Sequence, residues 1–397
     1  MIASSMGCTL AELETRGARD TAGEILQQPK LWREVSHTAR ARRDSTEEFL
    51  RPLLARKDLR IVLTGAGSSA FAGELLAPAL TRELRRRIEP IPTTDIVSNP
   101  REYFAEDVPT LLVSFSRSGD SPESVAAGLL AEECLSEVYH LIITCNSEGE
   151  LHRYHADRDR SLVLLMPDGS NDKGFAMTSS FTCMVLATWL TLGRSMPDEG
   201  LIDQLDEAAV SVLTRYMAPV RALANTGYKR VVYLGSGPLA GLAQESALKL
   251  LELTAGGVVS YSNSAMGFRH GPKAVLDDST LALVYLSRDP YTRQYDLDIV
   301  KELRGAMGAA SVIVISASGI DDLSGQNVWQ IDGLHHVDDA VSALPFALLA
   351  QLLGLEFSLA LGKTPDNPFP SGAVNRVVKA VTIYTLPESG SLDTGSA

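Results

Sequence analysis

The sequence predicts an α/β protein made of two tandem three-layer αβα domains with mainly parallel sheets, N-terminal helices and a C-terminal tail. From Leu59 onward, short apolar runs typical of buried strands alternate with helix-like stretches. Such βαβ alternation indicates a parallel sheet with helices on both faces. The pattern also occurs twice, because Gly235 follows Gly65 by 170 residues and Ser287 follows Ser116 by 171. Two strand–turn pairs that repeat at one offset indicate a duplicated domain.

The chain divides into four expected parts. Its 397 residues exceed what one hydrophobic core usually supports, so two domains are expected. Residues 1–50 are dominated by Ala, Glu, Arg and Leu and predict accessory helices. The first domain is assigned to residues 51–205 and the second to 216–365. The tail, residues 366–397, is rich in turn residues but contains an apolar run, so we expect it to fold back onto the body.

Nine strands are expected, each a short apolar run. The first-domain strands are predicted at Leu59–Thr64, Ile91–Thr94, Leu111–Ser116, His140–Asn146 and Leu162–Pro167. The second-domain strands are predicted at Tyr228–Gly235, Val258–Ser262, Leu281–Ser287 and Ser311–Ala317. An apolar helix is predicted after Leu344.

Composition restricts the class of protein. The formal net charge of −13 has no acidic tail and argues against nucleic acid or an anionic membrane surface as a partner. We expect no membrane span, because no run approaches about 18 apolar residues. The N-terminus lacks a signal-like apolar core, and the four cysteines have no CxxC spacing, so reduced thiols in a cytoplasmic protein are expected. No metal site is expected; His152 and His155 are interpreted as a surface pair.

The segment Leu111–Ser124 is the strongest candidate for a binding loop. The predicted strand ends in a loop that contains Ser116, Ser118 and Ser121, with Arg117 as its single basic residue. Ser121 is a good helix N-cap and the following proline fits the first helical position. Hydroxyls, backbone amides and a helix N-terminus together form an anion pocket, typically for phosphate. The alternative is an ordinary Ser-rich turn. The second copy lacks this loop, so only the first should bind phosphate.

No cofactor-binding motif is complete in this sequence. The turn Gly65–Ser69 follows a strand, but Ala70 replaces the third glycine of a dinucleotide fingerprint. The turn Gly235–Ala240 fits GxGxxA better, but no acidic residue ends its next strand, where one should bind a ribose. No GxxxxGK[ST] sequence occurs. We therefore expect no cofactor.

Candidate acid–base groups lie in the second copy. Glu245 and Lys249 have the spacing of an i,i+4 ion pair and are interpreted as a surface pair. Glu252 lies among leucines and is either solvated or a carboxylate in an apolar site with a raised pKa, suited to act as a general base. His270, between basic residues in GFRHGPK, is either an ordinary loop residue or a proton shuttle.

In combination these segments resemble a known family. GAGSS and SFSRSGDSPES, with ESALKLLELTAG and GFRHGPK, resemble the flavodoxin-like tandem sugar-isomerase (SIS) domains, as in the isomerase half of glucosamine-6-phosphate synthase. IPTTDIVSNP, GFAMTSS, DPYTRQYDLD and SGAVNRVV are similar to the galactosamine-6-phosphate deaminase/isomerase branch, also described as tagatose-6-phosphate ketose/aldose isomerase. The resemblance covers residues from about 20 to 385.

The resemblance implies roles for individual residues. Glu252 would move the proton between C2 and C1 of the sugar, and His270 would assist ring opening across a dimer interface. The synthase's serine and lysine in VASTK correspond here to Met177 and Ser179, so contacts there are open. The residues implied at the substrate phosphate are Ser69, Ser116, Arg117, Ser118 and Ser121, and the further substrate-binding candidates are Gly67, Ser68 and Lys379.

The implied activity is conversion of the hexosamine 6-phosphate D-galactosamine 6-phosphate to D-tagatose 6-phosphate and ammonia, by a cytoplasmic homodimer or higher homo-oligomer. No metal is needed, because a carboxylate base and a phosphate anchor can perform an enediol-type shift. One alternative is aldose–ketose isomerisation without deamination. The other is a non-catalytic regulator that senses a sugar phosphate.

Overall fold

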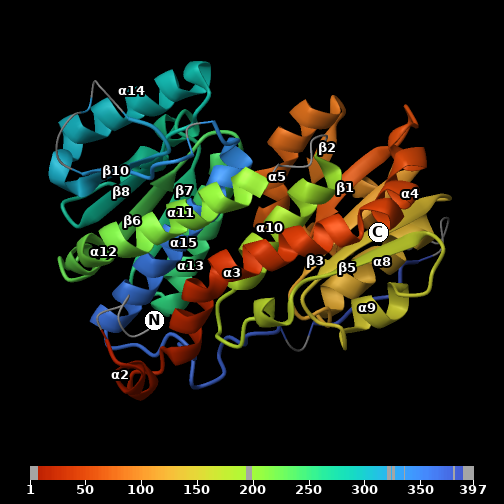
Figure 1. Ribbon diagram of the computed structural model, residues 1–397, viewed down its shortest axis with the longest axis horizontal. Helices are drawn as coiled ribbons and strands as arrows, with labels where there is room; N and C mark the ends of the chain where they lie inside the picture. Colours follow the sequence, from red (N-terminus) through yellow and green to blue (C-terminus); the bar gives the residue numbers. More distant parts are fainter. Residues whose placement is uncertain are drawn as a thin grey trace, which may run out of the picture.

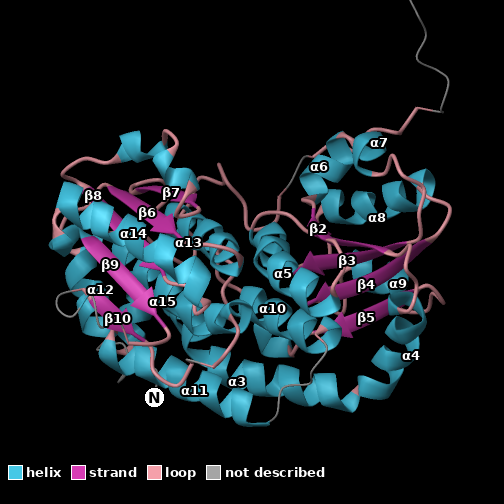
Figure 2. Ribbon diagram, turned by 90° about the horizontal axis from the view of Figure 1, so that it is seen from above, coloured by secondary structure: helices cyan, strands magenta, loops and turns pink. Residues whose placement is uncertain are grey.

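Two five-stranded parallel sheets form the framework of the protein. The computed structural model describes residues 8–193, 199–319, 323, 327–334, 336–378 and 381–387. Figure 2 shows the sheets at opposite sides of the molecule, with helices on both faces of each and helices α5, α10 and α13 between them. The predicted pair of αβα domains is therefore confirmed.

The elements follow one another as the βαβ pattern predicts. The N-terminal helices are α2 (Leu10–Thr15), α3 (Arg19–Ala41) and α4 (Arg43–Leu54). The first sheet and its helices are β1 (Arg60–Thr64), α5 (Ser68–Leu84), β2 (Ile88–Pro90), α6 (Thr93–Ser98), α7 (Pro100–Tyr103), β3 (Thr110–Ser116), α8 (Pro122–Cys134), β4 (Val138–Thr144), α9 (Glu150–His155), β5 (Ser161–Leu165), η1 (Asp168–Ser170) and α10 (Ser179–Leu192).

The second half repeats this arrangement after two connecting helices. Its elements are α11 (Glu199–Arg215), α12 (Met217–Ala224), β6 (Arg230–Leu234), α13 (Pro238–Leu253), β7 (Val259–Asn263), η2 (Gly267–Arg269), η3 (Pro272–Val275), β8 (Thr280–Tyr285), α14 (Pro290–Met307), η4 (Ala309–Ser311), β9 (Val312–Ser316), β10 (Val328–Gln330) and α15 (Asp339–Ala360). Figure 1 shows this half as the green-to-blue part of the chain.

The two sheets have the same topology. Their strand orders are β2-β1-β3-β4-β5 and, read in the matching direction, β7-β6-β8-β9-β10. Gly67 and Gly237, 170 residues apart, adopt nearly identical backbone angles, with φ of 56° at both and ψ of −126° and −128°. Positive φ favours glycine, because it has no Cβ. The predicted duplication is therefore confirmed down to the turn that begins each central helix.

Two strand predictions need correction. The strand expected at Ile91–Thr94 is instead β2, and helix α6 begins at Thr93, inside the expected strand. Pro90 ends β2, which is tolerated because β2 is an edge strand and a proline there deprives no neighbour of a ladder hydrogen bond. Strand β10 was not predicted; its three residues give too short an alternation to recognise.

Helices α5 and α13 meet at the centre of the molecule. A Cβ on Gly241 of α13 would lie 2.4 Å from the backbone nitrogen of Leu75 on α5, so only glycine permits this approach. A Cβ on Gly67 would lie 3.8 Å from Leu248 Cδ2, which places the GAGSS turn against α13. Since α5 and α13 both start at the carboxyl ends of strands, their packing brings the two loop regions together.

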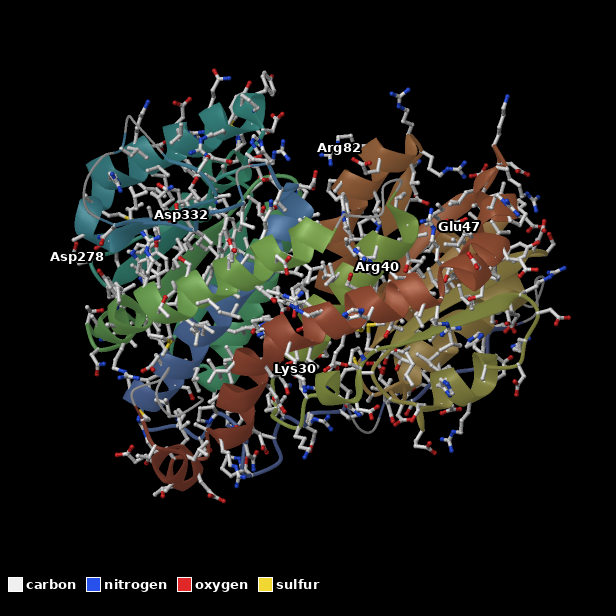
Figure 3. All side chains as sticks on the ribbon, viewed as in Figure 1. Lys30, Arg40, Glu47, Arg82, Asp278 and Asp332 are labelled. Carbon is white, nitrogen blue, oxygen red and sulfur yellow. The ribbon has the colours of Figure 1, made fainter. Side chains whose placement is uncertain are left out.

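Helix α15 lies along α13 and is buried throughout, with a Cβ on Gly354 reaching 2.9 Å from Leu253 Cδ1. This helix corrects the expectation that no apolar run is long enough to span a membrane. Its 22 residues have a mean hydropathy of 1.7 in their most apolar window, which is enough by length and composition. That window is completely buried within the protein, as in the core helix of a globular domain. The surface, by contrast, carries charged side chains such as Lys30, Glu47 and Asp278 (Figure 3).

The first part of the tail folds back onto the body, as predicted, but the apolar run that motivated the prediction does not pack there, because Val381, Ile383 and Tyr384 are 37–81% exposed. Asp366 Oδ1 accepts hydrogen bonds from the Thr21 amide at 2.8 Å and the Thr21 hydroxyl at 2.7 Å, at the start of α3. Farther along, the Phe369 and Phe175 rings lie 5.2 Å apart. Figure 1 shows the blue tail running from the second half along the first. The tail therefore connects both domains.

One histidine prediction is wrong. His155 is 2% exposed and its ring packs against that of His140 in a tilted arrangement, at a centroid distance of 4.5 Å, so it is not a surface residue. Burial lowers the pKa of His155 to about 3 and that of His140 to about 4. Both rings are therefore neutral at physiological pH.

Candidate functional site between the two copies

The serine-rich loop after β3 is held in a defined conformation by its own polar groups. The Ser116 hydroxyl accepts a hydrogen bond from the Gly119 amide at 2.9 Å, and the Ser118 hydroxyl accepts one from the Asp120 amide at 3.3 Å. Asn146 of the neighbouring loop donates to the Ser118 carbonyl at 2.7 Å. Gly119 has a φ of 71°, which permits the tight reversal. The loop is therefore shaped before any ligand binds.

Helix α8 begins at this loop. Ser121 is at the N-cap position and Pro122 at the first helical position, as predicted, but the Ser121 hydroxyl does not cap the helix. It hydrogen-bonds to the Ser124 hydroxyl at 2.6 Å instead. The first backbone N–H groups of this 13-residue helix lack that side-chain cap, which suits them to an anion in the loop.

The GAGSS turn forms the second wall. Ser68 and Ser69, in the first turn of α5, are 3% and 4% exposed, whereas Gly67 is exposed. The Ser69 hydroxyl lies 4.0 Å from the sulfur of Met177. This contact brings the FAMTSS segment, where the family resemblance left contacts open, against the GAGSS turn.

Arg117 is oriented away from a simple ligand role. Its side chain is buried, and its two terminal nitrogens donate to the carbonyls of Phe175 at 3.2 Å and Arg376 at 2.9 Å. Burial lowers its pKa from the usual value, and Arg376 acts in the same direction. Arg117 therefore connects the serine-rich loop after β3, residues 116–121, to the tail. We call this segment the phosphate loop after its predicted ligand; the contact of Arg117 with phosphate stays a prediction.

The interpretation of Glu245 and Lys249 as a surface pair is wrong. The Lys249 and Glu245 side chains are 1% and 2% exposed, and Lys249 Nζ lies 3.6 Å from Glu245 Oε1 and 2.6 Å from Glu252 Oε2. The Glu252 side chain retains 26% exposure. The buried cation thus orients the carboxylate that the sequence singled out as a base, while one side of Glu252 remains accessible.

The charges of Glu245, Lys249 and Glu252 interact with one another and with a residue of the first copy. Burial raises the pKa of Glu245 to about 7, although Lys249 opposes the rise. Burial alone would lower the pKa of Lys249, but Glu245 and Glu252 outweigh it and raise the pKa. The Glu252 carboxylate also acts on the Arg117 guanidinium across the domain boundary. Glu252 of the second copy and Arg117 of the serine-rich loop therefore lie near one another at the boundary between the copies.

His270 lies apart from this cluster. It is exposed, between the short helices η2 and η3, and its backbone N–H bonds to the Gly267 carbonyl at 3.0 Å. No described contact within one chain joins its ring to Glu252. Lys379 lies outside the described residues.

Comparison with known proteins agrees with this arrangement. A family model for the SIS domain matches residues 53–194, the first copy. The chain is 46% identical to the D-galactosamine-6-phosphate deaminase AgaS of Shewanella sp. strain ANA-3, over 96% of each chain. It is 56% identical to an AgaS protein of Streptomyces coelicolor, over 92% of this chain and 95% of that one. The chain belongs to the AgaS family of SIS-domain proteins.

A solved structure supports the same assignment. A Clostridium novyi NT protein, described as a tagatose-6-phosphate ketose/aldose isomerase, superimposes with a TM-score of 0.90 at 42% identity. The alignment covers 96% of this chain and 99% of that one, so the AgaS-family fold extends over both copies and the tail.

Sequence reasoning missed Asp172, which organises the segment beside Ser69. Its carboxylate accepts backbone hydrogen bonds from Thr178 at 2.8 Å, Ser179 at 3.0 Å and Ser180 at 2.9 Å, at the start of α10. Its carbonyl accepts from Arg376 of the tail at 3.0 Å. No local sequence signal could reveal these roles of Asp172. It lies seven residues before the helix that it caps, and Arg376 lies 204 residues after Asp172.

Glu24 was missed as well. Its carboxylate accepts hydrogen bonds from the backbone of Gly174 and Lys173, on the segment that Asp172 organises. Burial and the nearby Asp172 raise its pKa to about 7. Among the residues that the structure describes, no group of three or more His, Cys, Asp or Glu side chains could hold a metal ion.

The raised pKa of Glu245 predicts a pH-dependent stability. Its folded-state pKa of about 7 exceeds the usual 4.5, so the folded protein retains a proton that the unfolded chain has lost. The unfolding free energy should therefore fall as pH rises through this window, by at most about 1.4 kcal/mol per pH unit. Glu245→Gln should reduce that fall, measured by urea unfolding at pH 5 and 8, whereas Glu48→Gln on the exposed face of α4 should not. Equal pH dependence in all three proteins would contradict the assignment.

Proposed function

We propose that this chain is a D-galactosamine-6-phosphate deaminase that produces D-tagatose 6-phosphate and ammonia. The observation that carries this proposal is the placement of Glu252, held at 2.6 Å by the buried Lys249, opposite the phosphate loop of the other copy. The activity named for the Shewanella relative, at 46% identity over 96% of the chain, supports the same substrate. Phosphate at one copy and a base at the other fit a phosphorylated sugar whose reacting carbons lie at the far end.

The site divides the reaction into binding and proton transfer. Hydroxyls and amides of the phosphate loop hold the 6-phosphate, which orients the open-chain sugar toward Glu252. Glu252 removes the proton from C2 of the amino aldose, giving an enaminol, and returns a proton to C1. The resulting C2 iminium takes up water, and ammonia leaves to give the ketose. A carboxylate suffices for both proton transfers.

Two alternatives remain distinguishable. The Clostridium novyi NT relative is described as a tagatose-6-phosphate ketose/aldose isomerase, which favours aldose–ketose isomerisation without loss of nitrogen. A sensor that binds a sugar phosphate without turnover would need no oriented carboxylate at Glu252, so the ion pair with Lys249 disfavours it.

We also propose that the protein works as a homodimer or higher homo-oligomer in the cytoplasm, with His270 completing the site of a neighbouring subunit. The exposed position of His270 supports this. Three apolar side chains that precede it in the sequence are also exposed, as expected of a surface that binds another subunit: Leu251, Val259 and Met266, at 40–54%. The four free cysteines are compatible with a reducing compartment. The net charge of −13 disfavours nucleic acid and anionic membranes as partners.

Ammonia release tests the activity directly. The purified protein should release ammonia from galactosamine 6-phosphate, more slowly from glucosamine 6-phosphate, and not from their N-acetyl forms, because an amide nitrogen does not form the iminium. A coupled assay for ammonia measures this, with the ketose phosphate assayed in parallel. Release from none of these sugars, with interconversion of tagatose 6-phosphate and its aldose, would favour the plain isomerase.

The division between the copies predicts opposite kinetic signatures. Glu252→Gln should lower kcat by about 10²–10⁴-fold with little change in KM, because it removes only proton transfer. Ser118→Ala should raise KM by about 10–100-fold, the cost of one hydrogen bond to a charged group, and change kcat less. Steady-state kinetics of both variants provides the measurement. A Ser118→Ala variant that loses kcat at unchanged KM would place the loop among the catalytic groups.

Hybrid oligomers test the role of His270. If His270 acts on a neighbouring site, co-expressed Glu252→Gln and His270→Asn subunits should form hybrids with one intact site. In a random mixture of dimers about a quarter of the wild-type sites should be restored. Activity of affinity-separated hybrids, compared with each variant alone, measures this. Hybrids no more active than the separate variants would place both residues in one subunit's site.

A further inference from the structure

A single carboxylate on α14 holds both sides of the loop that presents His270. Arg269 Nε donates to Glu302 Oε2 at 2.7 Å, and Lys273 Nζ donates to the other oxygen, Oε1. Arg269 immediately precedes the histidine and Lys273 follows it by three residues. Glu302, 32 residues after His270 in the chain, therefore binds the loop on both sides of the histidine from helix α14.

The rest of the loop leaves His270 as its free apex. Phe268 is completely buried in the core of the second domain, which fixes the loop from below. Gly271 has a φ of 113°, a conformation that reverses the backbone directly after the histidine. With Phe268, Arg269 and Lys273 all anchored, the backbone on both sides of His270 is held in place.

The charges of the three groups fit this role. The hydrogen bonds from Lys273 and Arg269 lower the pKa of Glu302, so the carboxylate is ionised at physiological pH. One negative charge thus offsets part of the two positive charges beside His270. Single exposed ion pairs add little to stability. The effect of Glu302 does not depend on stability. Because its carboxylate binds the loop on both sides of His270, it acts on the position of that histidine.

We propose that Glu302 is a positioning residue for His270. It acts through Arg269 and Lys273 and touches neither the sugar nor the reacting atoms. The inference rests on the proposed function and deepens it, since it assigns a residue that orients the ring-opening histidine. Loss of Glu302 should therefore affect turnover and leave phosphate binding, at the other copy, intact.

Glu302→Gln tests this, with Glu302→Asp as the conservative variant and Asp298→Asn as the matched control. Asp298 is exposed on the same helix, and its substitution removes the same charge. Glu302→Gln should lower kcat about tenfold or more, up to the roughly 10²–10⁴-fold expected of His270→Asn, with KM nearly unchanged. Glu302→Asp should recover part of the loss, and Asp298→Asn should resemble the wild type. Protection by inorganic phosphate against thermal unfolding should be the same in all.

A double-mutant cycle with His270→Asn separates positioning from general damage. In the His270→Asn background, Glu302→Gln should cause no further loss, because the group that it positions is already absent. Multiplicative losses would overturn the proposal, as would a Glu302→Gln variant as active as Asp298→Asn or a His270→Asn variant with full activity. If the wild-type protein released no ammonia, the proposed function would fail instead, and that result precedes the cycle.

Discussion

The site depends on one buried cation. Lys249 lies within the packed boundary between α5 and α13, where a lone charge would be prohibitively costly. Glu252, at 2.6 Å, offsets this cost, and Glu245, at 3.6 Å, adds to the effect when it is ionised. Removing one partner of such a cluster leaves an uncompensated charge, typically a loss of about 3–5 kcal/mol. The ion pair that makes the buried lysine tolerable therefore also fixes the Glu252 carboxylate, the base of the proposed function.

The duplication explains why the two copies differ in function. In the second copy, Asp296 accepts hydrogen bonds from the Ser236 hydroxyl at 2.6 Å and the Ser287 amide at 3.0 Å. These donors lie on the loops after β6 and β8, the counterparts of the GAGSS turn and the phosphate loop. Asp339 accepts from the Ser287 hydroxyl and the Arg288 amide. In the second copy the protein's own carboxylates thus occupy these donors, whereas the loop amides of Gly119 and Asp120 in the first copy donate to neutral serine hydroxyls and meet no carboxylate.

The features that the sequence predicts correctly are those that depend on residues close together in the chain. The repeat offset, the paired glycine turns and the start of α8 after Ser121 all appear in the structure, because each depends on neighbouring residues. The Glu245–Lys249 pair was misinterpreted, because i,i+4 spacing places two residues on one helix face without saying what covers that face. It is covered by the other copy, and the importance of Asp172 likewise depends on Arg376, 204 residues later. Contacts at such separations leave no signal in a single sequence.

The position of Arg117 bears on how an anion is held by a protein of net charge −13. With both terminal nitrogens bound to backbone carbonyls, its guanidinium acts at a distance and fixes the loop to the tail. The phosphate must then be met mainly by neutral donors: serine hydroxyls, loop amides and the N-terminus of α8. Such donors are preorganised, so little reorganisation is required when the anion binds. The contact of Arg117 with the Arg376 carbonyl at 2.9 Å joins this loop to the tail. In the proposed function, the buried Arg117 would therefore serve anion binding indirectly, by keeping the donors of the loop in place.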